Sequence, residues 1–327
     1  MESSGARRRR RARPSRARPL LYTALAAVTV VGGTAAGTVY AGAQAHSGSG
    51  VVSSSASPSA SGSATADGKE SVATVAQPAV DHDALLSAAM KSVDAEDGAR
   101  VSVAVLDLES GESARCGDGA FDTASIVKVD ILATLLLQAQ DAGRQLTAAE
   151  RSYATAMIEN SDNASASALW QAIGGADGLD AANERFGLTG TGGGGGALWG
   201  LTRTTAADQL TLLEQVFGDD SELGEASRAY LRGLMGQIAA DQHWGVSAAA
   251  DDGRWALKNG WLPRSTTGLW VVNSIGRVAV DGHGYLVAAL SDGNSTKAKG
   301  ISLVEAAARA AVSAFTDDDV PAVSASG

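Results

Sequence analysis

The chain has a single cysteine, Cys116, among its 327 residues. No disulfide can form within one chain, so a folded domain must rely on its hydrophobic core for stability. A lone cysteine is also more often a small buried residue than a nucleophile. Cysteine chemistry is therefore not expected to explain what this protein does.

Histidine is also scarce, with only His46, His82, His243 and His283. None lies in the strand-turn-helix context of a serine–histidine–aspartate hydrolase, so that class of enzyme is disfavoured. Cysteine, histidine and aspartate do not cluster at the spacing of metal ligands either. The sequence predicts no metal and no other cofactor.

Most of the chain has few positive charges and carries a net negative charge. The whole sequence carries −10, and residues 1–18 alone hold eight arginines and one acidic residue, so the remainder carries −17. An acidic body argues against nucleic acid as a partner.

The arginine-rich start precedes an uncharged stretch, 20–45, which is strongly apolar at first and ends in Ala43-Gln44-Ala45. A basic start, an apolar run and a small-x-small site are typical of a secretory signal. The stretch is also long enough to span a bilayer if it is not cleaved. We expect residues 1–45 to be a signal peptide or a single-span membrane anchor, and the rest to be extracellular or at the cell surface.

The remaining sequence divides by composition into three parts. Residues 46–80 are mainly serine, alanine and glycine, which is typical of a flexible linker. Residues 81–316 are sufficient for one mixed domain, which we expect to be monomeric. Residues 317–327 are predicted to be a disordered tail.

Both ends of the domain predict strands, and its middle predicts helices. The strands are expected over 101–105, 254–260, 269–280 and 285–290. The helices are expected over 83–93 with Asp83 as cap, and over 125–142, 147–159, 161–173, 180–186, 204–216, 226–234 and 301–315. This order predicts an α+β fold, in which the terminal strands form one antiparallel sheet flanked by helices and the central helices form a second lobe.

Ser125 and Lys128 lie three residues apart at the start of the longest apolar run after the N-terminal segment. In a helix this spacing places both side chains on one face. The helix start also offers unpaired backbone N–H groups. A hydroxyl nucleophile, an amine that can accept its proton and donors for an oxyanion are the groups that acyl transfer requires. A single Ser-x-x-Lys pattern is nevertheless expected about once by chance in so serine-rich a chain.

Two further motifs follow in order: Ser161-Asp162-Asn163 at a helix start and Lys258-Asn259-Gly260 on a strand. Together with Ser125-x-x-Lys128 they resemble the motif set of the class A serine β-lactamases and the penicillin-binding proteins. The likeness covers residues 83–316. It implies a serine hydrolase of β-lactamase-like fold.

The resemblance implies three catalytic residues, Ser125, Lys128 and Ser161. Ser125 would be the acylated nucleophile, and Lys128 would accept its proton if burial and positive neighbours lower the pKa of the amine. Ser161 would relay a proton to the departing nitrogen. Asn163 would hold Lys128 and the amide of the substrate.

The resemblance also implies the substrate-binding residues Asn163, Lys258, Asn259, Gly260 and Trp261. Lys258 would supply positive charge to a substrate carboxylate and to the Ser161 relay, and is expected to serve this role rather than the core. The backbone N–H groups of Ser125 and Trp261 would form an oxyanion hole.

The chain departs from the family pattern in three places. The segment between the Ser125 helix and Ser161 is shorter than in class A enzymes, which removes a loop that walls the cleft. Asn259 stands where the family has threonine or serine, so an amide replaces a hydroxyl contact to the substrate carboxylate. Class A enzymes also carry a glutamate that activates the deacylating water, whereas the corresponding segment here, 188–200, holds no acid and contains the five glycines 192–196. We expect this loop to be mobile. Glu159 could substitute, although solvation on a helix surface is its more common role.

Three functions remain open on these grounds. The first is a β-lactamase-like serine hydrolase that forms an acyl-enzyme with β-lactams and deacylates slowly. The second is a peptidase or transpeptidase-like enzyme acting on cell-wall peptides. The third is a non-catalytic binding module of the same fold. The intact Ser125, Lys128, Ser161 and Lys258 favour an enzyme with a small-molecule or peptide substrate.

Overall fold

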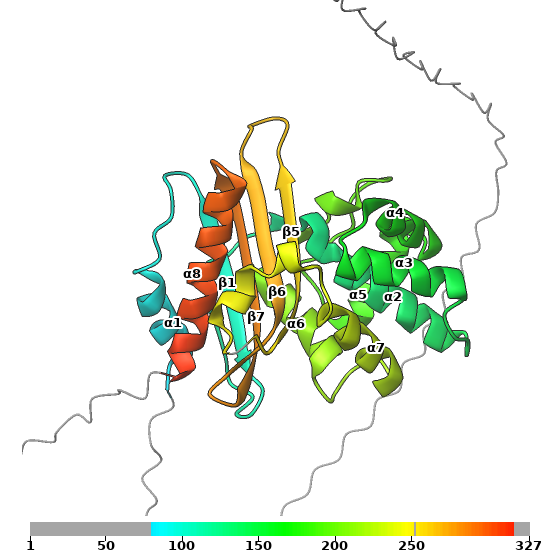
Figure 1. The fold of residues 1–327 in the computed structure, drawn as a ribbon, viewed down its shortest axis with the longest axis horizontal. Coiled ribbons are helices and arrows are strands. Elements are labelled where there is room, and N and C mark those ends of the chain that lie inside the picture. Colours follow the sequence, from blue (N-terminus) through cyan, green and yellow to red (C-terminus); the bar gives the residue numbers. More distant parts are fainter. Residues whose placement is uncertain (1–79, 252, 317–327) are drawn as a thin grey trace, which may run out of the picture. The chain divides into compact units, whose positions relative to one another are not determined.

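The computed structural model describes residues 80–251 and 253–316 (Figure 1). The predicted signal peptide or anchor (1–45), all but the last residue of the predicted linker (46–80) and the predicted tail (317–327) lie outside the described residues. Within the described part of the chain, no helix is both long and apolar enough to cross a membrane.

A five-stranded antiparallel sheet joins the two ends of the described chain, with the strand order β2-β1-β7-β6-β5. Its strands are β1 (Arg100–Asp107), β2 (Ser113–Cys116), β5 (Trp255–Pro263), β6 (Trp270–Val280) and β7 (His283–Asn294). β1 pairs directly with β7, with Val103 opposite Ala289. The predicted sheet of N- and C-terminal strands is thus confirmed, and β5, which carries Lys258, forms one edge of it.

Helices cover both faces of this sheet (Figure 1). They are α1 (His82–Met90) and α8 (Lys297–Thr316) on one face and α6 (Ala206–Phe217) on the other. Successive β1 residues point to opposite faces. Val103 and Val105 therefore pack in the cluster with α8, while Ala104 packs in the cluster that includes α6 and the helical lobe.

The first helix begins two residues earlier than predicted. Asp81 is its N-cap and accepts a hydrogen bond from Ala84 N over 3.0 Å. Asp83, the predicted cap, instead accepts from Arg115 N on β2 over 2.7 Å. The helix buries Leu86 completely. Asp81 thus caps the helix, and Asp83 contacts the sheet. The local sequence could not show which of the two aspartates is the cap.

The central helices form the predicted second lobe (Figure 1). They are α2 (Val127–Asp141), α3 (Ala148–Glu159), α4 (Asn163–Ala172), α5 (Gly175–Phe186) and α7 (Glu225–Met235). α2 contacts the other four. α3 begins with the predicted capping box between Thr147 and Glu150. The predicted α+β architecture is therefore confirmed.

α2 is buried on all sides, and its charged residues are buried with it. Lys128 is fully buried, and Asp130 is 1% exposed. Burial raises the pKa of the Asp130 carboxyl to about 8. A hydrogen bond from the Asn183 amide lowers this pKa, whereas the negative charges of Asp180 and Asp208 raise it further. Asp130 is thus a protonated, neutral side chain at neutral pH.

The Asp130→Asn variant is expected to gain stability relative to the wild type as the pH rises. The folded wild type holds a proton on Asp130 up to about pH 8, whereas the unfolded chain releases it at about pH 4. The wild-type free energy of unfolding therefore falls as the pH rises between these values. Asparagine has no such proton to lose. The stability difference should grow by on the order of a few kcal/mol across this range.

Denaturant unfolding at about pH 5 and at about pH 8 measures this difference. Asp177→Asn, an exposed position of the neighbouring helix α5, is the matched control and should show little change with pH. A pH-independent difference between wild type and Asp130→Asn would contradict a protonated carboxyl in the core.

Candidate active site

Ser125 lies in a 3₁₀ turn, η1 (Ala124–Ile126), that leads directly into α2. Strand β5 passes very close to this turn. A Cβ atom at Gly260 would lie 2.7 Å from both Ser125 N and Thr123 O, so only glycine fits there. From β6, Asn273 Nδ2 donates to Thr123 O over 3.0 Å. The sheet edge thus holds Ser125 at the start of α2, with a 3₁₀ turn where the sequence predicted the first helical turn.

Lys128 connects α2 to the start of α4. Its Nζ donates to Ser161 O over 2.7 Å, to Ser161 Oγ over 3.1 Å and to Asn163 Oδ1 over 2.8 Å. Burial lowers the pKa of Lys128 to about 7, against a smaller opposing effect of the Asp162 carboxylate. A substantial fraction of this amine is therefore neutral at physiological pH and able to accept a proton.

Ser161 lies between the two motif lysines. Its Oγ is 3.1 Å from Lys128 Nζ and 3.0 Å from Lys258 Nζ. Its backbone is in the left-handed region with a φ of 54°, unusual for a residue other than glycine. α4 begins two residues later, where Asp162 accepts from Ser165 N over 2.7 Å. The structure thus brings together one hydroxyl and two amines from three separate motifs.

Lys258 is fully buried, which differs from the expectation that it lies outside the core. Its Nζ donates to Ser161 Oγ over 3.0 Å, to Gln242 Oε1 over 3.4 Å and to Asn259 O over 3.0 Å. Burial, followed by the charge of Lys128, holds the pKa of Lys258 well below its usual range. Lys258 therefore has the position for a proton relay and is at the same time part of the packed interior.

Asn259 does not have the position that its predicted substrate contact requires. The side chain is fully buried, and its Nδ2 donates to Gln242 O over 2.8 Å and to Trp244 O over 3.0 Å. Consecutive strand residues point to opposite faces, so Asn259 points away from the face that carries Lys258 and Gly260. Its amide fixes the preceding segment against β5 and has no N–H left for a substrate carboxylate.

A cavity of about 650 Å³ lies beside Ser125. Its lining comprises residues 124–125, 163, 167, 197–201 and 261–266. Of the predicted site residues, Ser125, Asn163 and Trp261 line this cavity, and the others (Lys128, Ser161, Lys258, Asn259 and Gly260) are not part of its lining. The lining contains no aspartate and no glutamate. Acid–base chemistry in the cavity must therefore use the amines and hydroxyls.

The glycine-rich loop 188–200 forms one wall of the cavity through its last residues. The run 192–196 is more restrained than its composition predicts. Gly192 exchanges two backbone hydrogen bonds with Arg203. Further hydrogen bonds join Gly193 N to Asp180 Oδ1 (2.7 Å), Gly194 N to Thr202 Oγ1 (3.1 Å) and Trp170 Nε1 to Gly196 O (2.8 Å). These bonds would limit the mobility that we expected from five consecutive glycines.

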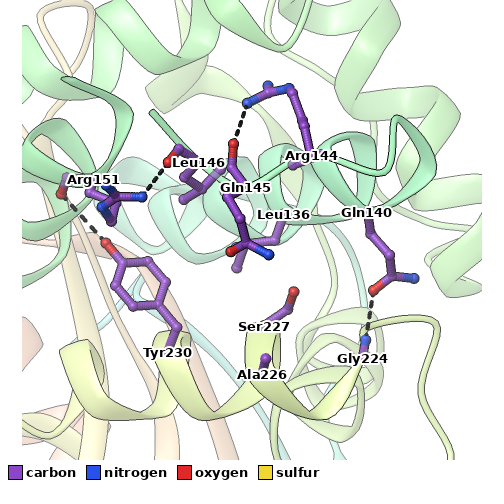
Figure 2. Close-up of a pocket in the computed structure, with 11 residues that line it drawn as sticks. Leu136, Gln140, Arg144, Gln145, Leu146, Arg151, Gly224, Ala226, Ser227 and Tyr230 are labelled. Carbon is purple, nitrogen blue, oxygen red and sulfur yellow. Dashed lines mark hydrogen bonds between the residues drawn. The ribbon is translucent and has the colours of Figure 1, made fainter. Parts of the chain in front are cut away.

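Glu159 is the last residue of α3, and its backbone carbonyl accepts from Ala239 N over 2.8 Å. Burial raises the pKa of Tyr230 on α7, and the Glu159 carboxylate contributes to the same shift. Tyr230 lines a different cavity of about 340 Å³ between α2, α3 and α7, where its hydroxyl donates to Arg151 O over 3.4 Å (Figure 2). Glu159 is absent from the lining of the Ser125 cavity, so this position favours the surface role.

Three residues that the sequence did not single out belong to the site. Trp199 places its ring centroid 5.0 Å from Lys128 Nζ, and Gln242 contacts Lys258. Arg264 lines the cavity four residues beyond Gly260. Trp199 is in the loop 188–200, which corresponds to the segment of class A enzymes that carries the deacylating glutamate. An aromatic residue in that loop could therefore have been predicted to lie near the site. No spacing rule indicates Gln242 or Arg264, because tertiary packing alone brings them there.

Comparisons with known proteins agree with this fold. The family described as "Beta-lactamase enzyme family" matches residues 137–315, a range that begins after Ser125 and Lys128. No curated protein matches the sequence. Among solved structures, a mutant of PBP-A in acyl-enzyme complex with penicillin G is 23% identical, with a TM-score of 0.62 over 72% of this chain and 97% of that chain.

Two β-lactamase structures show the same fold. The TLA-1 extended-spectrum β-lactamase is 16% identical, with a TM-score of 0.63 over 70% of this chain and 97% of its own. A β-lactamase from Xanthomonas campestris is 20% identical, with a TM-score of 0.56 over 70% of this chain and 95% of its own. These likenesses support the fold, and the family match spans more than half of the sequence. The chain belongs to the beta-lactamase enzyme family.

Proposed function

We propose that this protein is a serine hydrolase that forms an acyl-enzyme at Ser125 with β-lactam amides and releases it slowly. The observation that carries the proposal is the position of Ser161 Oγ, within hydrogen-bond distance of the buried amines of Lys128 and Lys258. Ser125 lines the adjoining cavity. These are the groups that opening of a strained amide requires.

In the proposed acylation, neutral Lys128 accepts the proton of Ser125 Oγ, directly or through a water. In this structure Lys128 Nζ donates to Ser161 and Asn163, and none of the described hydrogen bonds joins it to Ser125 Oγ. The Ser125 oxygen then attacks the lactam carbonyl carbon. The backbone N–H groups of Ser125 and Trp261 hold the resulting oxyanion.

Collapse of this intermediate breaks the C–N bond, and the departing nitrogen needs a proton. Ser161 donates its hydroxyl proton to that nitrogen and takes the proton that Lys128 received, across the 3.1 Å contact. The amine of Lys258 donates to Ser161 Oγ over 3.0 Å, and this hydrogen bond stabilises the oxygen as its proton leaves. Ser125 is then acylated and both lysines return to their initial protonation states.

Release of the acyl group by water is the slow step of the proposal, because no carboxylate lines the cavity. The same feature is compatible with an enzyme that transfers or cleaves cell-wall peptides, the alternative function. Retention of two costly buried amines disfavours a module that only binds. The arginine-rich start and the apolar stretch that follows support the proposal that the protein is exported or anchored at the cell surface.

Fluorescent penicillin is expected to label the wild-type protein covalently, and the rate of labelling should rise with pH through about 7. Lys128 has a lowered pKa of about 7, so the neutral amine that accepts the Ser125 proton increases in this range. Labelling at a series of pH values, followed by denaturing electrophoresis, measures the rate.

Ser125→Ala should carry no label. Ser167→Ala is the matched control, since Ser167 is another serine of the same cavity, and should remain labelled. Equal labelling of Ser125→Ala and wild type would contradict the assignment of the nucleophile, and a rate that falls as the pH rises through 7 would contradict the role of Lys128.

A further inference from the structure

The cavity beside Ser125 has one charged side chain in its lining, Arg264. The guanidinium is held in place, since Arg264 Nη1 donates to Asp122 Oδ2 over 2.5 Å. Arg203 Nη1 lies 3.2 Å from the other oxygen of the same carboxylate. Asp122 is 8% exposed, whereas the side chains of Arg264 and Arg203 are 36% and 49% exposed, so these charge pairs are only partly shielded from water. Asp122 thus pairs with two guanidinium groups, and of these only that of Arg264 lines the cavity.

Arg264 also retains hydrogen-bonding capacity. A guanidinium has five N–H donors, and among the described residues only the Nη1 of Arg264 donates to the protein. The Asp122 contact therefore fixes the orientation of the group without occupying all of its donors. A fixed guanidinium with unused donors at a cavity wall favours anionic over cationic groups nearby.

The order of residues along β5 indicates which part of a bound substrate Arg264 would meet. Trp261, whose N–H is the proposed oxyanion donor, lies three residues after Lys258 and three before Arg264. An extended chain advances about 3.3 Å per residue, which puts Lys258 roughly 10 Å along β5 from Trp261. Arg264 is the first residue after the strand, on the opposite side of Trp261. If Lys258 attracts the carboxylate of a β-lactam, Arg264 lies toward the acyl side chain at the other end.

We propose that Arg264 is a specificity-determining residue, which favours β-lactams with an anionic acyl side chain and disfavours those with a cationic one. This inference rests on the proposed acylation of Ser125. Its physical basis is the charge of the guanidinium together with a cavity lining that has no carboxylate to bind an ammonium group. The exposed Leu198 and the neighbouring Pro263 leave neutral apolar side chains acceptable.

Three penicillins with one nucleus test the proposal, because they differ only at the α-carbon of a phenylacetyl group. Penicillin G has hydrogen there, ampicillin an ammonium group and carbenicillin a carboxylate. The second-order rate of Ser125 acylation is measured by intact-mass spectrometry at low ionic strength, at a pH where the ampicillin amine is protonated. Carbenicillin should acylate about tenfold faster than ampicillin, as partly exposed charge pairs allow, with penicillin G between them. The difference should shrink as salt is added.

Variants of the two arginines that share Asp122 separate a direct charge effect from a structural one. Arg264→Gln should reduce the carbenicillin-to-ampicillin ratio to about 1, and Arg264→Lys should retain most of it. Arg203→Gln is the matched control. It removes the other partner of the same carboxylate but does not line the cavity, so the ratio should stay as in the wild type.

The results that overturn the proposal are distinct from those that overturn the proposed function. Equal acylation rates by carbenicillin and ampicillin in the wild type, or loss of the preference in Arg203→Gln as much as in Arg264→Gln, would overturn the specificity role while leaving acylation of Ser125 intact. A failure of all three penicillins to form an adduct would overturn the proposed function, and this inference with it.

Discussion

After free penicillin G is removed, the wild-type protein is expected to keep the penicilloyl adduct on Ser125 long enough for intact-mass spectrometry to detect it. Hydrolysis of the ester needs a water and a base within hydrogen-bond reach of that water. Neither the cavity lining nor the loop 188–200 supplies a carboxylate. A missing general base typically costs about 10²–10⁴ in rate. Acylation should thus outpace release by a wide margin.

The adduct should be absent in Ser125→Ala, which is the control for its site. Fast steady-state turnover without a trapped adduct would mean that another base is present. Glu159→Gln would then be the first variant to test, although the carboxylate acts on Tyr230 on the α7 side of the lobe. Absence of an adduct under all conditions would support a binding module instead.

Much of the fold could be predicted from the sequence, because it depends on local patterns, whereas the meeting of the three motifs was expected only from the family resemblance. The apolar period of α2, the capping box at Thr147 and the glycines that end α4 each act within a few residues. Helix α5 shows where such signals weaken. It begins at Gly175 and not at the predicted Asp180. Gly175 and Gly178 disfavour a helix, and the burial of Leu179 compensates for their low helix propensity.

The orientation of Asn259 could have been predicted as well. Strand residues alternate between the two faces, so a lysine at 258 that points into the site requires the next side chain to point away. The family resemblance implies the opposite, an amide contact to the substrate, whereas in this structure both N–H groups of the Asn259 amide are used by Gln242 O and Trp244 O. The burial of Lys258 is a different case. It depends on Gln242 and on the helical lobe, 16 and 97 residues away in sequence, which no local pattern encodes.

The second large effect is a gain of function: Trp199→Glu is expected to shorten the lifetime of the adduct by about 10²-fold. Trp199 is in the loop where the resemblance leads us to look for the missing glutamate, and its ring centroid is 5.0 Å from Lys128 Nζ. Glutamate is smaller than tryptophan, so its carboxylate fits in the space that the ring occupies. There it lies near the ester and can activate a water. Adduct mass followed over time after removal of penicillin G measures the rate.

Leu198→Glu is the matched control, since it introduces the same charge at the adjacent position, where the side chain is 58% exposed. Solvent competes for a carboxylate at this exposed position of the cavity wall, so Leu198→Glu should accelerate release much less than Trp199→Glu. Trp199→Glu should also move the pH profile of acylation to higher pH, because a new negative charge near Lys128 raises the pKa of the amine. A shifted profile without faster release would show that the carboxylate reaches Lys128 but not the water. Equal release rates in the two variants, with no shift, would contradict the position of Trp199 beside the reacting groups.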